Sequence, residues 1–302
     1  MTGALRGVVL ERDGSVYRVA TGEGEVRAVL RGRTKRGTPK VVVGDHVTLE
    51  ADAGGELYGI AEVAERRTLR ERRVPEGRGT RPVAANIDEV FVVTSAADPA
   101  PIPQLLDRLL VVAEANGIPA AIVINKSDIA DPEPLAARFR RAGYPVHITC
   151  ARTGAGIAEF ADALRGHIAV VTGPSGAGKS SLLNAIQPGL TLRVGAVSEK
   201  VGRGRHTTVG AVMIPLERGG FLVDTPGFSE VGLWGIEPRE LASCFPEMRP
   251  LIGECRYPDC RHVTEPRCAI RAAVERGEIA ADRLESYHVL LAELEGEPRE
   301  WE

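Results

Sequence analysis

Residues Gly173 to Ser180 read Gly-Pro-Ser-Gly-Ala-Gly-Lys-Ser and follow the apolar run Ile168 to Val171. A strand, a glycine-rich turn and the start of a helix are the context in which such a sequence binds phosphate. Backbone N–H groups of the turn would cradle the phosphates, and the positive end of the new helix would add to the attraction. Lys179 would pair with the β- and γ-phosphates, and the Ser180 hydroxyl would hold Mg²⁺. The expected phosphate-binding residues are Gly173, Pro174, Ser175, Gly176, Ala177, Gly178, Lys179, Ser180 and Ser181.

The chain around this loop, over residues 88–235, alternates apolar runs with helical stretches. Near-continuous apolar strands joined by crossover helices predict a mainly parallel sheet and a central α/β domain with a P-loop. The expected strands are Val90–Val93, Ala121–Ile124, Val146–Ile148, Ile168–Val171 and Phe221–Val223, with Val209–Pro215 antiparallel at the edge. The expected helices are Ile102–Asn116, Pro134–Ala142, Gly156–Gly166 and Lys179–Ile186.

A second motif, Asn125-Lys126-Ser127-Asp128, follows the strand Ala121–Ile124 and has the form that recognises guanine. Asp128 can accept hydrogen bonds from guanine N1–H and N2–H₂, which adenine does not offer, and this difference gives selectivity. Lys126 can lie across the base, and Asn125 can tie the base loop to the P-loop. Further along, Cys150 and Ala151 occupy the usual Ser-Ala place, where a backbone N–H meets guanine O6. A cysteine is acceptable there because that contact is made by the main chain.

The order of these two motifs is the reverse of that in an ordinary Ras-like GTPase, where the P-loop comes first. The simplest account is a GTPase domain that has been circularly permuted. The loop sequence also resembles that of guanylate kinases, which would make the protein a phosphotransferase. Because guanylate kinases have neither base-recognition segment, the two segments together favour the GTPase.

Two further segments complete the expected catalytic machinery. Asp224 and Gly227 belong to an Asp-Thr-Pro-Gly turn that can hold the Mg²⁺ shell and sense the γ-phosphate. In the loop between this turn and the P-loop, Thr208, or alternatively Thr207, would complete the Mg²⁺ shell.

Ras-like enzymes orient the attacking water with a glutamine just after the turn, whereas this chain has Phe228. Intrinsic hydrolysis should therefore be slow. His206 is the candidate to place the water, and the alternative is an ordinary solvent-exposed loop histidine. The expected catalytic residues are thus His206, Thr208 and Lys179.

A cluster of metal-binding residue types lies near the C-terminus, at Cys255, Cys260, His262 and Cys268. Three thiolates and one imidazole suit a closed, tetrahedral and structural Zn²⁺ site. The alternative is a set of unrelated buried thiols. The remaining cysteines, Cys150 and Cys244, are isolated and are expected to be packing residues.

The N-terminal residues 1–75 alternate short β-like runs, among them Val41–Val43, with glycine and aspartate turns. This pattern predicts an OB-like five-stranded barrel, with an SH3-like barrel as the competing interpretation.

The arginine-rich stretch Arg66 to Arg81 is interpreted as a basic, mobile linker, placed at 76–87 in the domain division. Such segments often grip RNA phosphates, although they are also often just solvated connectors. Residues 236–302 are acidic and hold the Cys/His cluster and two helices, Ala269–Arg276 and Ala281–Leu294.

The whole chain has 302 residues, of which 43% are hydrophobic and 26% charged, with a formal net charge of −3. No run approaches the roughly 18 apolar residues that suggest a membrane span. The N-terminus lacks the apolar core of a secretory signal, so a cytoplasmic protein is expected. In a reducing compartment, clustered cysteines favour metal binding over disulfides.

The motif order, the Gly-Arg-Gly-Arg-His-Thr-Thr loop ending at Thr208, the Asp-Thr-Pro-Gly-Phe turn from Asp224 and the Cys/His spacing together resemble one family. It is the ribosome small-subunit-dependent GTPase A family of bacterial circularly permuted GTPases, and the resemblance covers nearly the whole chain. It implies an OB barrel, a permuted GTPase domain and a mainly helical zinc-binding domain. It also implies GTP hydrolysis stimulated by the 30S subunit during its late maturation, with 16S rRNA as a binding partner. The protein itself is expected to be a monomer.

Family resemblance also implies guanine contacts at Asn125, Lys126 and Asp128, zinc at the Cys/His cluster and a hydrolytic role for His206. Two positions depart from the family pattern: Cys150 replaces the more usual serine, and Val209 follows Thr208. Neither threatens nucleotide binding. Because the turn at Asp224 shortly precedes Cys255, the nucleotide state could be coupled to the flanking domains. The alternatives from other classes are a nucleotide-salvage kinase and a binding-only, GTP-gated adaptor.

Overall fold

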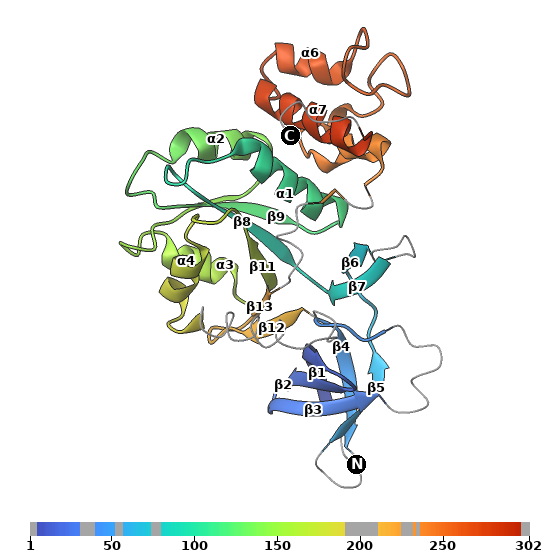
Figure 1. Ribbon diagram of the computed structural model, residues 1–302, viewed down its shortest axis with the longest axis vertical. Coiled ribbons are helices and arrows are strands. Elements are labelled where there is room, and N and C mark those ends of the chain that lie inside the picture. The colour runs from blue at the N-terminus through green and yellow to red at the C-terminus, as the bar shows by residue number, and fades with distance from the viewer. Residues whose placement is uncertain are drawn as a thin grey trace. The chain divides into compact units, whose positions relative to one another are not determined.

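The computed structural model describes residues 5–30, 40–51, 57–73, 80–190, 211–224, 232–233 and 236–296 of the chain. Figure 1 labels the helices and strands within these ranges. None of the described helices is both long enough and apolar enough to cross a lipid bilayer.

The N-terminal part is a closed five-stranded barrel (Figure 1). Its strands pair in the order β1-β2-β3-β5-β4, with β3 and β5 parallel and the other neighbours antiparallel. Their bounds are β1 Leu5–Asp13, β2 Val16–Thr21, β3 Gly24–Leu30, β4 His46–Ala51 and β5 Tyr58–Val63. The barrel core consists of Val9, Tyr17, Val19, Ala28, Val41, Val47, Leu49 and Ile60. The predicted OB-like five-stranded barrel is confirmed.

The three valines Val41–Val43 do not form the strand that their β-propensity predicts. Val43 makes only an isolated β-bridge, and the chain turns sharply at Gly44, where φ is +87°. A Cβ atom at Gly44 would lie 2.0 Å from the carbonyl oxygen of Ala85, so only glycine fits this turn. The Asp45 carboxylate accepts the N–H of the middle valine at 2.8 Å. The run is therefore a buried loop, because a side chain satisfies the backbone group that a strand partner would otherwise satisfy.

Part of the stretch Arg66–Arg81, which the sequence suggested to be a mobile linker, forms paired strands. Strands β6 (Leu69–Arg73) and β7 (Thr80–Ala85) pair antiparallel as a separate two-stranded sheet, and β7 falls within the predicted linker 76–87. Antiparallel neighbours in sequence pair readily because only a short loop has to close between them. The high arginine content concealed this pairing.

Two arginines of the same stretch are also already neutralised within the protein. The Arg66 guanidinium donates to both carboxylate oxygens of the buried Asp45, with Nε–Oδ1 at 2.7 Å and Nη2–Oδ2 at 2.9 Å. The Arg67 Nη2 atom lies 2.9 Å from Asp88 Oδ1. Arg66 is therefore a structural ion-pair partner of the barrel rather than a free phosphate ligand.

The central α/β part contains one six-stranded sheet in the order β10-β9-β8-β11-β13-β12. Strands β8, β9 and β10 are parallel to one another, β11 is parallel to β13, and β12 is antiparallel to β13. The mainly parallel sheet and its antiparallel edge are thus as predicted. The strands are β8 Glu89–Ser95, β9 Ala120–Asn125, β10 Val146–Ile148, β11 Ile168–Thr172, β12 Val212–Pro215 and β13 Phe221–Asp224. The helices are α1 Pro103–Ala115, α2 Glu133–Arg141, α3 Ile157–Ala163 and α4 Lys179–Ile186.

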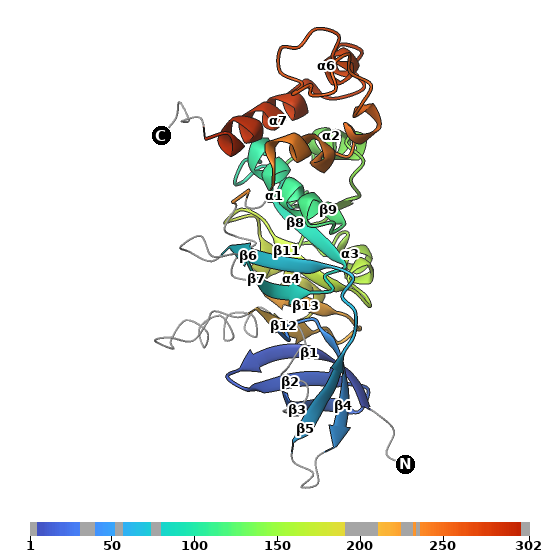
Figure 2. The ribbon, with the colours of Figure 1, turned by 90° about the vertical axis from the view of Figure 1, so that its right-hand side faces the viewer.

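The C-terminal part is mainly helical, as predicted. It contains the 3₁₀ segments η1 (Pro238–Cys244) and η2 (Arg249–Leu251) and the helices α6 (Ala269–Glu275) and α7 (Ala281–Leu294). Helix α7 lies beside α1 of the α/β part (Figure 2). Its buried face includes Tyr287, Leu290 and Leu291, which provides the apolar contact area that a short helix needs for stability.

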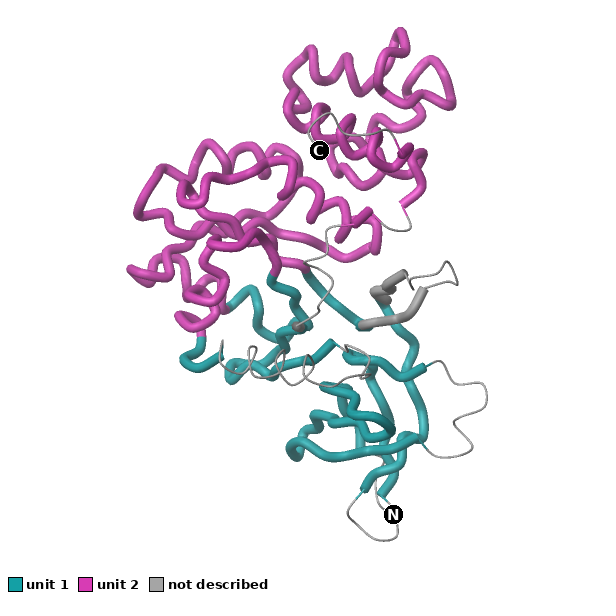
Figure 3. Tube along the Cα trace, viewed as in Figure 1, with its two compact units in different colours: residues 1–89, 162–171, 187–229 teal, residues 90–161, 172–186, 230–302 magenta. Residues whose placement is uncertain are grey.

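The chain divides into two compact units (Figure 3). One comprises residues 1–89, 162–171 and 187–229, and contains the barrel with β12, β13 and most of β11. The other comprises residues 90–161, 172–186 and 230–302, and contains β9, β10 and most of β8, together with the glycine-rich loop and the C-terminal helices. Because these units cut the chain elsewhere, the predicted domain boundaries at 75, 87 and 235 stay a prediction.

Candidate functional site

The glycine-rich loop between β11 and α4 is packed too tightly to accept side chains at its glycines. Gly173, Gly176 and Gly178 have positive φ values of 140°, 79° and 87°. A Cβ atom on Gly173 would lie 2.0 Å from Val93 O, and one on Gly178 would lie 2.4 Å from Asn125 Nδ2. The loop therefore lies directly against β8 and the end of β9. Close backbone approach of this kind also allows N–H groups to surround a phosphate.

Lys179, the first residue of α4, extends back over the same loop. Its Nζ atom donates to the carbonyl oxygens of Gly173 at 2.7 Å and Pro174 at 2.8 Å. Burial lowers the pKa of Lys179. A phosphate would offer this ammonium a charged acceptor, and charge-assisted hydrogen bonds are stronger than those to neutral carbonyls.

Asn125, the last residue of β9, joins the two nucleotide motifs. Its buried amide donates through Nδ2 to the carbonyl oxygens of Ala177 at 3.2 Å and Gly178 at 3.4 Å. Its Oδ1 atom accepts the backbone N–H of Ala151 at 3.1 Å. One side chain therefore holds the predicted base loop, the glycine-rich loop and the Cys150-Ala151 segment together. These segments lie more than 20 residues apart along the chain.

Asp128 accepts hydrogen bonds from two side chains that the sequence analysis did not connect with it. The thiol of the buried Cys150 donates to Oδ1 at 2.9 Å, so this cysteine contributes its side chain as well as its main chain. The Arg152 guanidinium donates to Oδ2 through Nε at 2.8 Å and Nη2 at 2.6 Å. The hydrogen bond from Cys150 and the ion pair with Arg152 lower the pKa of Asp128, which keeps its carboxylate ionised at neutral pH.

The segment after β8 is a part of the site that sequence reasoning missed. Lys126 has a positive φ of 60°, and its Nζ atom donates to the carbonyl oxygen of Asp98. A Cβ atom on Gly176 would lie 3.1 Å from Pro99 Cδ, so the same segment also borders the glycine-rich loop. The carboxyl ends of parallel strands gather at one sheet edge, and that rule could have drawn attention to the end of β8.

The remaining predicted nucleotide residues lie largely outside the described part of the chain. This holds for His206, Thr207, Thr208 and Gly227, and for Phe228 beside them. Asp224 is the last residue of β13, so the strand end predicted to carry it is present. Ser180 lies in the first turn of α4, next to Lys179.

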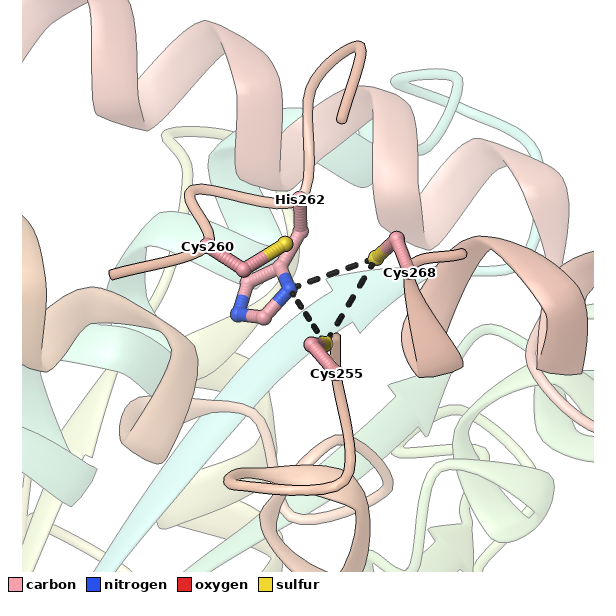
Figure 4. A group of neighbouring side chains, drawn as sticks. All are labelled: Cys255, Cys260, His262 and Cys268. Atoms are coloured by element: carbon pink, nitrogen blue, oxygen red, sulfur yellow. Dashed lines mark hydrogen bonds between the residues drawn. The ribbon is translucent and has the colours of Figure 1, made fainter. Parts of the chain in front are cut away.

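The four predicted metal ligands converge at one point (Figure 4). The ligand atoms of Cys255, Cys260, His262 and Cys268 all lie within 4.8 Å of one another. His262 Nδ1 lies 3.6 Å from Cys255 Sγ and 3.4 Å from Cys268 Sγ, and the two sulfur atoms are 3.9 Å apart. Tetrahedral Zn–S bonds of about 2.3 Å would place sulfur atoms roughly 3.8 Å apart. The four residues could therefore hold a metal ion.

Backbone groups support the thiols of this cluster. The N–H of Ala269 donates to Cys255 Sγ at 3.3 Å, and the N–H of Arg271 donates to Cys268 Sγ at 3.5 Å. Burial raises the pKa of the Cys260 thiol to about 12. A divalent cation would supply the positive charge that holds such thiols as thiolates.

Helix α7 supports the strained backbone of residues 255–268, the loop that carries the four candidate metal ligands and is called the metal loop below. His262 has a φ of +62°, a conformation that costs free energy in a residue other than glycine. The Tyr287 hydroxyl donates to the carbonyl oxygen of Arg261 at 2.9 Å, and the His288 Nε2 atom lies 2.9 Å from the carbonyl oxygen of His262. Two consecutive residues of α7 thus hold the two carbonyls on either side of the metal-loop bend.

A chain of buried charges joins α7 to the helices of the α/β part. Asp107 of α1, fully buried, accepts from Arg138 of α2 at 2.7 and 2.9 Å and from Arg283 of α7 at 2.7 Å. Arg283 is itself buried and donates to both carboxylate oxygens of Glu247, at 2.6 and 3.0 Å. Its guanidinium carbon also lies 4.6 Å from the ring centroid of Phe245. The C-terminal helices are therefore docked by paired charges as well as by apolar contact.

A glycine-rich phosphate loop, tied through one asparagine to a loop of guanine-recognition type, places the protein in the class of P-loop GTPases. The reversed order of the two motifs makes it a circularly permuted one. The chain belongs to the RsgA GTPase family, whose model, described as RsgA GTPase, matches residues 63–234.

Individual relatives and solved structures agree with this assignment. The small ribosomal subunit biogenesis GTPase RsgA of Gemmatimonas aurantiaca is 51% identical over 305 residues, covering 98% of this chain and 99% of the relative. That of Moorella thermoacetica is 45% identical, covering 96% and 97%. The crystal structure of YjeQ from Thermotoga maritima matches with a TM-score of 0.78 at 35% identity, covering 98% and 99%. YloQ, a circularly permuted GTPase, matches with a TM-score of 0.79 at 28% identity, covering 99% and 98%. The predicted permuted GTPase fold is confirmed.

Proposed function

We propose that this protein hydrolyses GTP during late maturation of the small (30S) ribosomal subunit. It binds 16S rRNA, is stimulated by the subunit, and couples its nucleotide state to the domains on either side of the GTPase domain. It acts in the cytoplasm as a monomer. The relatives named as small ribosomal subunit biogenesis GTPases support this proposal along nearly the full chain. The observation that carries the nucleotide part is the Asn125 amide, which links the base loop to the phosphate loop.

Each nucleotide contact has a residue suited to it. Residues 173–181 bind the phosphates, with Lys179 at the β- and γ-phosphates, and Asp128 reads the guanine edge. Hard oxygen donors suit magnesium, so the hydroxyls of Ser180 and Thr208 would hold Mg²⁺, and Asp224 would hold the shell of that ion. The Mg²⁺ ion supplies positive charge that offsets the charge developing on the phosphates. Gly227 senses the γ-phosphate, and His206 places the water.

The Cys/His cluster holds one structural Zn²⁺, since three thiolates and one imidazole leave no open coordination position. The purified protein should carry one zinc per chain, and Cys268→Ser should lose most of it because a hydroxyl is a poor zinc ligand. Cys244→Ser is the matched control, since Cys244 is also buried but lies outside the cluster. Elemental analysis of the three proteins measures this. Equal metal content in both variants would contradict the assignment.

Turnover of GTP with and without 30S subunits tests the proposed function. The protein alone should hydrolyse GTP slowly, because Phe228 stands where Ras-like enzymes have a water-orienting glutamine. Added 30S subunits should raise the rate severalfold, and 50S subunits should not. A rate that 30S subunits leave unchanged would favour a GTP-gated adaptor over an enzyme of subunit maturation.

A further inference from the structure

The carboxylate expected to recognise guanine has both of its oxygens engaged by protein donors. Cys150 donates to Asp128 Oδ1, and Arg152 donates twice to Oδ2. Guanine offers two adjacent donors, N1–H and N2–H₂, which need the same two oxygens. Any guanine that Asp128 accepts must therefore share these oxygens with Cys150 and Arg152 or replace one of them.

The Arg152 guanidinium is a close chemical likeness of the guanine edge. In both groups a carbon atom bonded to nitrogens presents neighbouring N–H donors in one plane, and such donors match a carboxylate. Arg152 applies two of these donors, Nε and Nη2, to Asp128 within 2.8 Å. Both donors go to Oδ2, so Arg152 occupies one of the two oxygens that guanine would need.

Of the two residues on Asp128, only Arg152 is free to move away. Its side chain is 74% exposed, whereas the side chain of Asp128 is 14% exposed. Cys150, in contrast, is buried, and its backbone N–H is fixed on the carbonyl oxygen of Ala155 at 2.9 Å. Cys150 is therefore held in place beside the carboxylate, and the exposed Arg152 is the partner that a ligand can displace.

We propose that Arg152 competes with guanine for Asp128, so that its side chain must leave Oδ2 before the base is accepted. This inference rests on the proposed function, because it takes Asp128 as the guanine-recognition residue. Arg152 is a positioning residue: it acts on the nucleotide through Asp128 and slows the entry of guanine nucleotides.

The expected effect is modest and has a definite sign. An exposed ion pair changes an equilibrium constant by up to about fivefold. Removing Arg152 should therefore speed GDP association by about two- to fivefold. Loss of a positive charge would by itself slow the approach of an anionic nucleotide. A faster association thus cannot come from long-range attraction and points to the lost competitor.

Stopped-flow measurement with a fluorescent GDP on the full-length protein tests the proposal through Arg152→Ala. Arg140→Ala is the matched control, since Arg140 is also exposed and paired with a carboxylate, that of Glu133 on α2. For Arg152→Ala the association rate constant should rise and the dissociation rate constant should stay unchanged, because the arginine has already left in the bound state. For Arg140→Ala neither constant should rise.

Three outcomes would overturn the competitor role. Unchanged association would mean that Arg152 does not oppose guanine. Slower association would mean that it supports the carboxylate, and faster dissociation would mean that it contacts the bound nucleotide. In all three cases wild-type GDP binding would leave the proposed function standing. Absence of GDP binding by the wild-type protein would remove both proposals.

Discussion

Replacing Arg283 with methionine is expected to lower the free energy of unfolding of the unit that contains α7 by about 3–5 kcal/mol. The substitution removes the arginine that pairs with Glu247 and leaves Asp107 with Arg138 alone. Arg283 pairs with both Asp107 and Glu247, and its own side chain is only 1% exposed. Methionine retains most of the aliphatic volume, so the loss reports on the charge rather than on a cavity. Denaturant unfolding of Arg283→Met and wild type measures it.

Arg276→Met provides the matched comparison. Arg276 pairs with Glu278 in the same C-terminal part, but its side chain is 54% exposed. Exposed pairs contribute about 0–1 kcal/mol, so this variant should unfold close to wild type. If Arg283→Met were no less stable than Arg276→Met, the buried charge chain would have no role in docking α7.

The same cluster predicts how stability changes in acid. Burial raises the pKa of Asp107, but the hydrogen bonds from Arg138 and the charge of Arg283 outweigh it, so the net pKa is lowered. A carboxyl group with a lowered folded-state pKa contributes stability above its unfolded pKa of about 3.9, and this stability is lost as the pH falls through the folded-state value. Arg283→Met weakens this lowering, so its acid unfolding should begin at a higher pH than that of wild type.

Asp128→Asn is expected to weaken GDP binding by about 10²- to 10⁴-fold. Each hydrogen bond from guanine to the carboxylate is charge-assisted and contributes about 1.5–3 kcal/mol, and the substitution affects both. In the asparagine, an NH₂ donor replaces the carboxylate oxygen that would accept guanine N2–H₂, so two donors face each other. Xanthine carries a carbonyl oxygen in place of that amino group, so the variant should gain affinity for xanthosine diphosphate. Calorimetric titration with GDP and with xanthosine diphosphate measures the two affinities.

Binding of xanthosine diphosphate serves as the internal control, because it shows that the variant is folded and retains its phosphate loop. Wild type should show the opposite order of affinities. A variant that still preferred GDP would mean that Asp128 does not recognise the base, and the guanine assignment of Asn125–Asp128 would have to be abandoned.

The sequence revealed those features whose residues are close together in the chain. The phosphate loop at Gly173, the base loop at Asn125 and the four metal ligands are local patterns with known chemistry, and the alternation of apolar strands and helices predicted the central sheet. The five-stranded barrel followed from short strands between turns. In each case a periodicity or spacing within about 15 residues carries the information.

Features that depend on pairing between distant residues were missed. Arg283 and Asp107 are 176 positions apart, and charged residues on helices are ordinarily expected at the surface. Arg66 lies in a stretch that resembles a solvated linker, yet its partner is Asp45, buried in the barrel. The Cys150 thiol was expected only to pack, because nothing in its sequence neighbourhood indicates the carboxylate of Asp128 22 positions earlier.

Helix α7 is a shared support, with Tyr287 and His288 on the metal loop and Arg283 on the charge chain. A fragment that ended before residue 236 would retain the Asp107–Arg138 pair of α1 and α2 but would lose Arg283, the second cation on Asp107, and helix α7, which lies against α1. Its α1 surface would expose apolar side chains that η1 and α7 now cover, and exposed apolar patches favour aggregation. We therefore expect the GTPase part to aggregate when residues 236–302 are absent. A stop codon that removes those residues would harm the nucleotide-binding part as well as the Cys/His cluster.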